Sequence, residues 1–347
     1  MPIDLFETRT MLEAVSLMKP AKTFLRDTFF ANQVHSLTEA VDIDIQKGAR
    51  RLAPFVHPRV GSKTVDNIGF STVSFTPPQI GPDYYFTGQD LQKRLPGENL
   101  YQGNTPDARL ARLIGNKLAE FDTMISRTEE WMCAQALFTG KITINGYGYN
   151  NAVIDFNVSN KAALTGKSKW NYIASDRTSN PISDMRTWKR AVLKASGENP
   201  DTCIFSPDVA DAFMSHPDVK DYFNSNQKAN IDYGQIAPKT AINGVYYIGR
   251  INELGLDIYS YEEYFIDPAD GVEKALVPAG TVLLCSSKVD FRMMYGAIID
   301  VEMGSYAMSR VPKSWVEKKP SARVLQLLSR PLPAIVLPDG LYIATVL

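Results

Sequence analysis

The three histidines are the residues in this chain best suited to acid–base or metal chemistry, and their spacing supports neither. His35, His57 and His216 lie far apart in the sequence, and none belongs to an H-E-x-x-H segment or stands beside a C-x-x-C pair. Those are the spacings that bring zinc ligands together. Each histidine is therefore interpreted as an ordinary surface or core imidazole, and the sequence predicts no metal site and no catalytic residue.

The sequence also lacks the glycine-rich and serine motifs that mark phosphate, dinucleotide and acyl-transfer sites. It contains no G-x-x-x-x-G-K-[ST] loop and no G-x-S-x-G turn. Gly146 and Gly148 begin a G-x-G, but the third glycine of a dinucleotide fingerprint is missing. Asp267 and Asp270 resemble half of a calcium loop without its remaining ligands, so a tight turn is favoured. We expect no cofactor.

Two adjacent acidic pairs and three cysteines are the other candidates for chemistry. Glu129–Glu130 and Glu262–Glu263 are interpreted as solvated faces, because neighbouring side chains on a helix or strand point in different directions. Cys133, Cys203 and Cys285 are odd in number, widely separated and set in apolar contexts. This pattern predicts buried free thiols.

Composition excludes further classes of protein. The 347 residues carry 37 basic and 38 acidic side chains, a net charge of −1, which argues against a dedicated nucleic-acid binder. An apolar content of 44% allows real cores, and the length corresponds to about two domains. Neither a signal peptide nor a membrane span is predicted. A metabolic enzyme remains an alternative, because many active sites have no local motif.

The stretch that must position the other elements is a predicted helix at residues 105–140. Thr105 suits the N-cap, Pro106 the first helical position, and Gly140 the residue just beyond the end. One face is apolar, with helical spacing between Leu110, Leu113, Ile114, Leu118, Phe121, Ile125, Met132 and Ala136. A helix of this length measures about 50 Å, roughly three times the usual globular helix. We therefore expect it to be the spine of an extended subunit.

Residues 1–50 read as an arm, and residues 51–86 as a proline-punctuated loop. The arm contains the aromatic cluster FLRDTFF at residues 24–30, whose rings pack either on the same chain or on a neighbouring chain. The segment at residues 60–75 reads as a protruding two-stranded hairpin, and such hairpins are only marginally stable alone. The hairpin is therefore expected to need a partner surface.

The remaining elements are read from periodicity and turn residues. A hairpin is expected at residues 141–160, followed by a polar connection at residues 161–180. Helices are predicted at residues 181–196, 207–214 and 217–224, and strands at 202–205, 245–251, 256–266, 281–286, 293–300, 323–328 and 341–347.

Several short motifs, taken in order, resemble the major capsid proteins of tailed bacteriophages of the lambda capsid protein E type. The motifs are FLRDTFF at 24–30, VSFTPPQIGP at 73–82, DARLAR at 107–112, FSPD at 205–208, RMMYG at 292–296 and VPKSW at 311–315. Each motif alone is weak, and their order over nearly the whole chain carries the resemblance.

The resemblance implies an α+β fold of the tailed-phage capsid (Hong Kong ninety-seven) type. In that fold, the expected parts are an N-terminal arm at residues 1–48, an extended hairpin loop at 49–86, a discontinuous peripheral domain at 87–180 and 304–347 with the spine helix at 105–140, and an axial domain at 181–303. Residues 226–240 are the candidate loop nearest the symmetry axes. An encapsulin-like compartment of the same fold is the alternative.

The resemblance further implies a structural protein rather than an enzyme. Its expected partners are copies of itself in pentamers and hexamers, a scaffold protein, a portal, a decoration protein and packaged double-stranded DNA contacted without sequence preference; no membrane is expected. Its place would be the virion capsid, assembled in the bacterial host cytoplasm. The expected contacts between subunits are Phe24, Phe29, Phe30, Val60, Val65, Phe70 and Phe75. Deletion of residues 1–48 is expected to leave a folded subunit that forms no closed particles.

Overall fold

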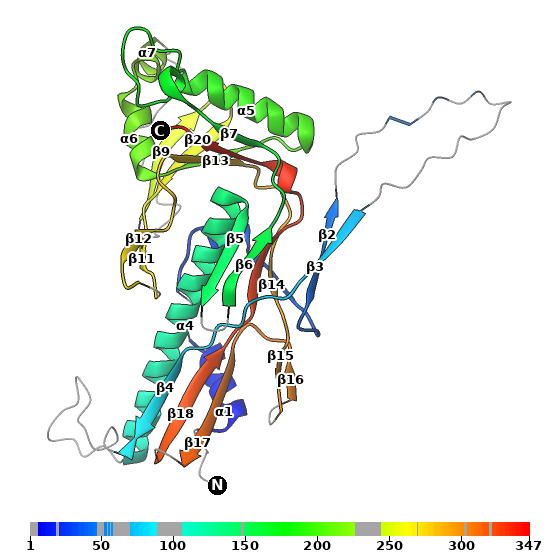
Figure 1. Ribbon diagram of the computed structural model, residues 1–347, viewed down its shortest axis with the longest axis vertical. Helices are drawn as coiled ribbons and strands as arrows, with labels where there is room; N and C mark the ends of the chain where they lie inside the picture. The colour runs from blue at the N-terminus through cyan, green and yellow to red at the C-terminus, as the bar shows by residue number, and fades with distance from the viewer. Residues whose placement is uncertain are drawn as a thin grey trace. The chain divides into compact units, whose positions relative to one another are not determined.

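The computed structural model describes residues 6–18, 21–46, 52, 53, 55, 57, 70–88, 106–146, 149–225, 244–268, 270–301, 304–318 and 321–347 (Figure 1). The chain divides into two compact units. Unit 1 contains residues 1–41, 74–131 and 293–333, and unit 2 contains residues 42–73, 132–292 and 334–347.

The predicted long helix is confirmed as α4 (Pro106–Thr139). Seven of the eight residues of its predicted apolar face are at most 9% exposed. Gly140 follows it with φ +74°, the left-handed conformation that glycine adopts most easily, and donates its N–H to Ala136. Lys161 donates to the carbonyl of Thr139, which places a positive charge at the negative end of the helix dipole. The sequence therefore determines which face of α4 is buried and where the helix ends.

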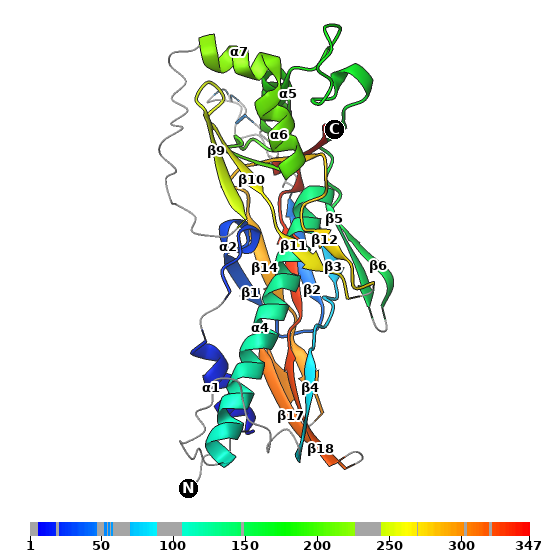
Figure 2. The same cartoon turned by 90° about the vertical axis from the view of Figure 1, so that its left-hand side faces the viewer.

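In unit 1, α4 packs on an antiparallel sheet ordered β17-β18-β4 (Val311–Lys318, Ser321–Leu328, Asp83–Thr87). Leu325 and Leu327 of β18 face Leu118 and Phe121 of α4 in one core. Helix α1 (Thr8–Ser16) adds the buried Met11 to this core and also contacts β17 (Figure 2). Helix α1, in the segment expected to be an arm, therefore belongs to the core of its own chain.

Several short elements lie wholly or partly in unit 1. Helix α2 (Leu25–Phe29) precedes β1 (Asn32–His35), which lies in a sheet ordered β1-β14-β19, with β14 at Phe291–Tyr295 and β19 at Pro331–Ile335. Strands β15 (Ile298–Asp300) and β16 (Gly304–Tyr306) form a hairpin. Ile298, Val311 and Leu328 form a small separate core.

Unit 2 is built on a six-stranded sheet ordered β7-β20-β13-β8-β10-β9. The strands are β7 (Lys161–Ala163), β20 (Leu341–Thr345), β13 (Thr281–Cys285), β8 (Thr202–Phe205), β10 (Leu256–Tyr261) and β9 (Val245–Ile251). Helices α5 (Pro181–Ala195), α6 (Pro207–Ser215) and α7 (Pro217–Ser225) contribute to its core, together with the fully buried Trp170. Trp170 stacks on Trp188 and donates its indole N–H to Asp184. Burial raises the pKa of that carboxyl.

Three two-stranded ribbons complete the described strands. They are β2–β3 (Val41–Gln46 and Phe70–Phe75), β5–β6 (Lys141–Gly146 and Tyr149–Asp155) and β11–β12 (Tyr264–Ile266 and Glu273–Ala275). One-turn helices η1 (Gly166–Ser168) and η2 (Pro338–Gly340) lie in connections. The β5–β6 hairpin confirms the one predicted at residues 141–160.

Two expectations about strand pairing differ from the structure. The described partner of β3 is β2, which the sequence assigned to the arm, whereas a hairpin within residues 60–75 was expected; residues 58–69 lie outside the described residues. The C-terminal strand β20 pairs with β13 and β7 in unit 2, whereas β17 and β18 pair with β4 in unit 1. Residues 304–347 therefore supply two different sheets, because the apolar β20 is buried next to the apolar β13.

Candidate functional site: a buried charge cluster on the long helix

The most unusual chemistry in unit 1 is a buried charge cluster centred on Glu129 of α4. Glu129 is 0% exposed, and its carboxylate accepts hydrogen bonds from two arginines. Arg310 donates from Nη1 to Oε1 at 2.6 Å and from Nη2 to Oε2 at 3.1 Å, and Arg26 donates from Nη1 to Oε2 at 3.0 Å. The hydroxyl of Tyr295 donates to Oε1 at 3.2 Å. One carboxylate therefore joins α4 to three other segments of the same unit.

Glu130, the next residue, holds the start of α2 through the backbone. Its Oε1 accepts the N–H groups of Phe24 and Leu25 at 3.0 and 2.7 Å, and its Oε2 accepts that of Arg26 at 2.9 Å. The first N–H groups of a helix have no partner within the helix, and a carboxylate there satisfies them and complements the dipole. A side chain on α4 thus performs the capping that α2 does not provide for itself, since Phe24 makes no side-chain cap bond.

The charges of the cluster compensate one another. Burial lowers the pKa of Arg310, but the hydrogen bonds and charge of Glu129, together with Tyr295 and the hydrogen bond to Asp122, outweigh burial, so the pKa is raised overall. The same balance, with Glu129 and Asp27 as partners, raises the pKa of Arg26. Burial, followed by the charge of Glu129, raises the pKa of Tyr295. The two arginines and Tyr295 therefore stay protonated at neutral pH, and the cluster serves attachment rather than proton transfer.

The sequence interpretation of Glu129–Glu130 as a solvated face is wrong. Their exposures are 0% and 2%. The error has a physical cause: adjacent residues on a helix do point differently, but α4 is covered on more than one side in this stretch, so both directions lead inward. The partners of Glu129 are Arg26 and Arg310, which lie far away in the sequence. No local pattern marks these arginines as its partners, so the sequence offers no usable signal for the cluster.

The aromatic residues of the arm pack within their own chain, one of the two alternatives that the sequence left open. Phe24, Phe29 and Phe30 are 2%, 7% and 1% exposed. Of the other expected contact residues, Val60 and Val65 lie outside the described residues. Phe70 and Phe75 are the end residues of β3, and the Phe75 side chain is half-buried. The candidate axis loop at residues 226–240 also lies outside the described residues.

The histidines fit the interpretation made from their spacing. His35 is an exposed residue of β1 whose ring contacts that of Tyr295, and His57 is exposed. His216 is buried between α6 and α7, where its Nδ1 accepts the backbone N–H of Asp218 and its Nε2 lies 3.0 Å from the hydroxyl of Ser179. Because Nδ1 accepts, the proton of the neutral ring resides on Nε2. Ser179 is itself buried, so this pair is a structural contact.

Burial of His216 predicts an acid-sensitive unit 2. Burial lowers the pKa of His216 in the folded state, so the unfolded chain binds the proton more readily. Stability from this residue is complete above the unfolded pKa of about 6.5 and falls as pH drops through that value. We expect the free energy of urea unfolding of unit 2 to decrease between pH 7 and pH 5. His216→Asn, which keeps an acceptor and a donor, should remove the histidine part of this decrease; an unchanged pH profile would contradict the assignment.

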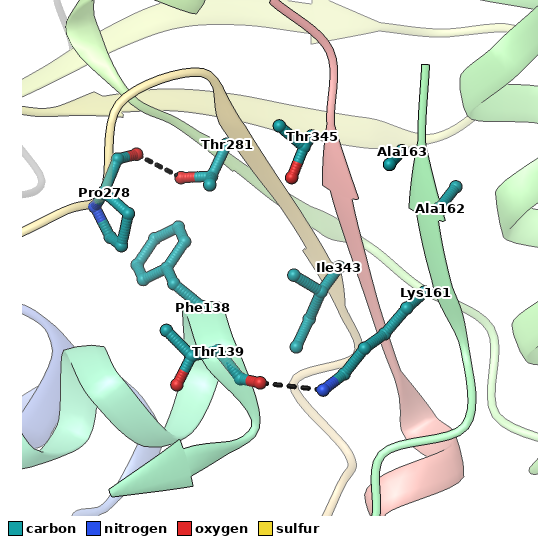
Figure 3. Close-up of a pocket in the computed structure, with 9 residues that line it drawn as sticks. All are labelled: Phe138, Thr139, Lys161, Ala162, Ala163, Pro278, Thr281, Ile343 and Thr345. Atoms are coloured by element: carbon teal, nitrogen blue, oxygen red, sulfur yellow. Dashed lines mark hydrogen bonds between the residues drawn. The ribbon is translucent and has the colours of Figure 1, made fainter. Parts of the chain in front are cut away.

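A shallow cavity of about 420 Å³ in unit 2 offers little chemistry. Its lining residues are Phe138, Thr139, Lys161, Ala162, Ala163, Pro278, Thr281, Ile343 and Thr345 (Figure 3). The one charged group among them, Lys161, donates to the Thr139 carbonyl, and the Thr281 hydroxyl donates to the Pro278 carbonyl. These nine residues contain neither an acid–base pair nor an activated nucleophile.

Metal ligands, membrane-spanning helices and reactive thiols are the other features considered for the described residues. Within the described ranges, no group of histidine, cysteine or acidic side chains is arranged to hold a metal ion, and no helix there is long and apolar enough to cross a membrane. Cys133, Cys203 and Cys285 are buried free thiols, as predicted. Burial raises the pKa of the Cys203 and Cys285 thiols, which makes them unreactive.

The comparison with protein families decides what the chain is. The family described as phage major capsid protein E matches residues 7–346. The chain belongs to this family. It is therefore a structural protein of the phage head and not an enzyme, and its place is the virion capsid.

Individual members of the phage major capsid protein E family are similar to this chain over almost their whole length. The major capsid protein of Enterobacteria phage P21 is 28% identical over 341 residues, which cover 97% of both chains. The P21 prophage-derived major head protein of Escherichia coli O6:H1 has the same identity and coverage. The major capsid protein of Escherichia phage N15 is 27% identical over 322 residues, or 91% of each chain.

Solved structures show the same mixed helix and strand fold for this capsid protein. The putative capsid protein of an Escherichia coli CFT073 prophage matches with a TM-score of 0.70 at 20% identity, covering 98% of this chain and 99% of that one. A phage-related protein from Bordetella bronchiseptica RB50 matches with a TM-score of 0.53 at 13% identity, covering 96% and 94%. These structures show the fold, and the family match over residues 7–346 confirms the resemblance to the lambda capsid protein E type.

Proposed function

We propose that this capsid protein assembles with copies of itself, as pentamers and hexamers, into an icosahedral shell around phage double-stranded DNA. The observation that carries the proposal is the family match over residues 7–346. A closed shell made from one protein needs head-to-tail contacts that close as rings. Many such contacts in one lattice give a stable whole even when each is weak. The family match favours this phage shell over an encapsulin-like compartment.

We assign the proposed parts of the capsid fold to the residue ranges expected from the sequence. Residues 1–48 serve as the arm, 49–86 as the extended loop, 87–180 and 304–347 as the peripheral domain, and 181–303 as the axial domain. The pairing of β17 and β18 with β4 supports a peripheral sheet that the chain returns to complete. The pairing of β20 with β13 supports one change to this proposal, in which the last strand is grouped with the proposed axial domain.

The β2–β3 ribbon is the proposed start of the extended loop. Its strands are separated in sequence by residues 47–69 and pair only with each other in the described chain. A two-stranded ribbon is marginally stable without a partner surface. A neighbouring subunit would supply that surface in the shell. Phe70 and Phe75 at the ends of β3, with Val60 and Val65 between the strands, are the proposed contact residues.

Replacement of residues 48–68 by Asn-Gly tests the extended loop. The dipeptide favours a tight turn between paired strands such as β2 and β3. We expect a subunit with unchanged thermal unfolding that forms no closed particles in negative-stain electron microscopy. As a control, Tyr147→Asn gives the connection between β5 and β6 the same Asn-Gly dipeptide, because residue 148 is already glycine, and it should leave particles intact. Normal shells from the replacement would remove the loop from the proposal.

Deletion of residues 1–48 does not test the arm, and the expectation that it leaves a folded subunit needs correction. That deletion removes the rings of Phe24, Phe29 and Phe30 and leaves Glu129 and Glu130 buried without their arm partners. Loss of a buried charge partner destabilises strongly. Such a variant would therefore fail through misfolding, and it would not report on assembly.

The remaining partners follow from the same function. A net charge of −1 suits a shell that must release its genome, because a strongly basic lining would hold phosphates through counterion release. DNA is therefore contacted without a dedicated site, and a scaffold protein, a portal and a decoration protein are the other proposed partners. The direct test of the function is negative-stain imaging of the purified wild-type chain. Closed particles support it, and a persistently monomeric chain overturns it.

A further inference from the structure

We infer that the β11–β12 hairpin of one subunit docks on the outer face of α5 in a neighbouring copy of the same chain. The inference rests on the proposed assembly into rings and names one of the contacts that would form them. The contact joins an exposed apolar and acidic surface on the hairpin of one copy to an exposed basic surface on α5 of the next copy. Both elements belong to unit 2 of their own chain.

One face of the hairpin is open to solvent and partly apolar. Tyr264 pairs with Ala275 and Ile266 with Glu273, so these four side chains lie on the same face of the ribbon. All four are exposed, with Tyr264 at 53% and Ile266 at 70%, and Val272 beside them is 54% exposed. We call Tyr264, Ile266, Val272 and Glu273 the hairpin surface.

The opposite face and the turn are occupied by contacts within the hairpin. Lys274 forms ion pairs with Asp267 and Asp270, and the Phe265 ring is half-buried. These contacts fix the ribbon so that the hairpin surface points outward as a unit. Residues 262–275 contain five acidic side chains and one lysine, a formal charge of −4, so a partner for the hairpin surface should be basic.

The outer face of α5 has the opposite charge. Its core side consists of Ile182, Met185, Trp188 and Val192, which leaves Ser183, Thr187, Arg190 and Lys194 on the exposed side at helical spacing. Residues 181–195 carry four basic side chains and one aspartate, a formal charge of +3. In the part of the chain that the structure describes, no ion pair of Arg190 or Lys194 is seen. Leu193, 40% exposed, adds an apolar contact beside them.

The two surfaces cannot meet within one subunit. The start of α5 is tied to the turn before β10, where Arg186 pairs with Glu253 and Lys189 donates to the Leu254 carbonyl. The hairpin begins after the other end of β10, and six strand residues span about 20 Å. Figures 1 and 2 draw α5 and the β11–β12 hairpin well apart in unit 2.

A second copy is therefore the occupant that satisfies both surfaces. Two different surfaces on one chain that match each other give a head-to-tail contact, the kind that closes into rings. Opposite charges at such a contact set register and exclude wrong partners, and like charges placed there cost several kcal/mol. The apolar residues supply burial, and the charges select the α5 face.

A charge exchange tests the contact. We expect Lys194→Glu and Glu273→Lys each to lower the yield of closed particles at least tenfold, and the double variant K194E/E273K to restore at least half of the wild-type yield. Ile266→Ser should lower the yield without changing the unfolding temperature. Asp211→Lys and Lys288→Glu, exposed charges elsewhere in unit 2, are the matched controls and should leave the yield unchanged.

The outcomes separate this contact from the proposed function. If the wild-type chain forms no closed particles, the shell proposal fails before any variant is compared. If both single variants form particles at the wild-type yield, the contact is overturned and the shell stands. If both single variants fold, as shown by circular dichroism, and fail to assemble while the double variant does not recover, the pairing of these two surfaces is likewise overturned.

Discussion

Glu129→Gln should destabilise unit 1 by about 3 to 5 kcal/mol, the usual result of removing one partner from a buried ion pair. The substitution keeps the size of the side chain but leaves the guanidinium groups of Arg26 and Arg310 without their shared charge. Both arginine side chains are 10% exposed, so water cannot replace the lost carboxylate. The free energy would be measured by urea unfolding of the unassembled chain, with hydrogen exchange of α4 amides to localise the change to unit 1.

Glu120→Gln is the matched control on the same helix. Glu120 pairs with Lys117 in a more exposed position, where an ion pair contributes about 0 to 1 kcal/mol. A double-mutant cycle with Arg310→Met should give a coupling energy of at least about 1 kcal/mol for Glu129, because contacting residues are not additive. A Glu129→Gln variant as stable as Glu120→Gln would show that the cluster does not hold unit 1 together.

Ala119→Pro should prevent normal folding of α4 and thereby abolish particles. The residue lies mid-helix on the exposed side, so the added ring meets no core side chain. The cost comes from the missing N–H and the clash with the preceding turn, about 3 kcal/mol or more. In a unit of this size the unfolding temperature should fall by roughly 6 to 12 °C, as measured by circular dichroism.

Ala119→Gly separates this effect from a change of side chain. Glycine costs about 1 kcal/mol in a helix interior and keeps the backbone hydrogen bond. The glycine variant should still fold and assemble, with a correspondingly smaller fall in unfolding temperature. Wild-type thermal stability in Ala119→Pro would refute the interpretation of α4 as the spine of the subunit.

Elements with strong local signals could be predicted from the sequence. α4 was expected at residues 105–140 and is found at Pro106–Thr139, because its apolar spacing and terminal residues agree. The strands at Thr202–Phe205 and Val245–Ile251 were predicted with the same bounds. In each case the periodicity of apolar residues and the neighbouring turn residues indicate the same element with the same bounds.

Features that depend on distant partners could not be predicted in this way. The burial of Glu129 follows from Arg310, which lies 181 residues away. Trp170 sits in a stretch that reads as a polar connection, yet its ring is fully buried because Trp188 and Phe205 surround it. The pairing of β3 with β2 instead of a nearer strand depends on register across a long insertion. Pattern within a segment carries no information about such pairings.

The attachment of α2 by Glu130 has a consequence for how this capsid protein can change over generations. The three hydrogen bonds to Glu130 come from backbone N–H groups, which every amino acid except proline provides. Substitutions at Phe24 and Leu25 can therefore accumulate without loss of this attachment, provided that the buried volume is kept, whereas the Arg26 side chain is also held by its ion pair with Glu129. The residue that must be kept is Glu130 of α4, which accepts all three hydrogen bonds. The amino acids at the start of α2 can therefore change while the attachment of α2 to α4 is kept.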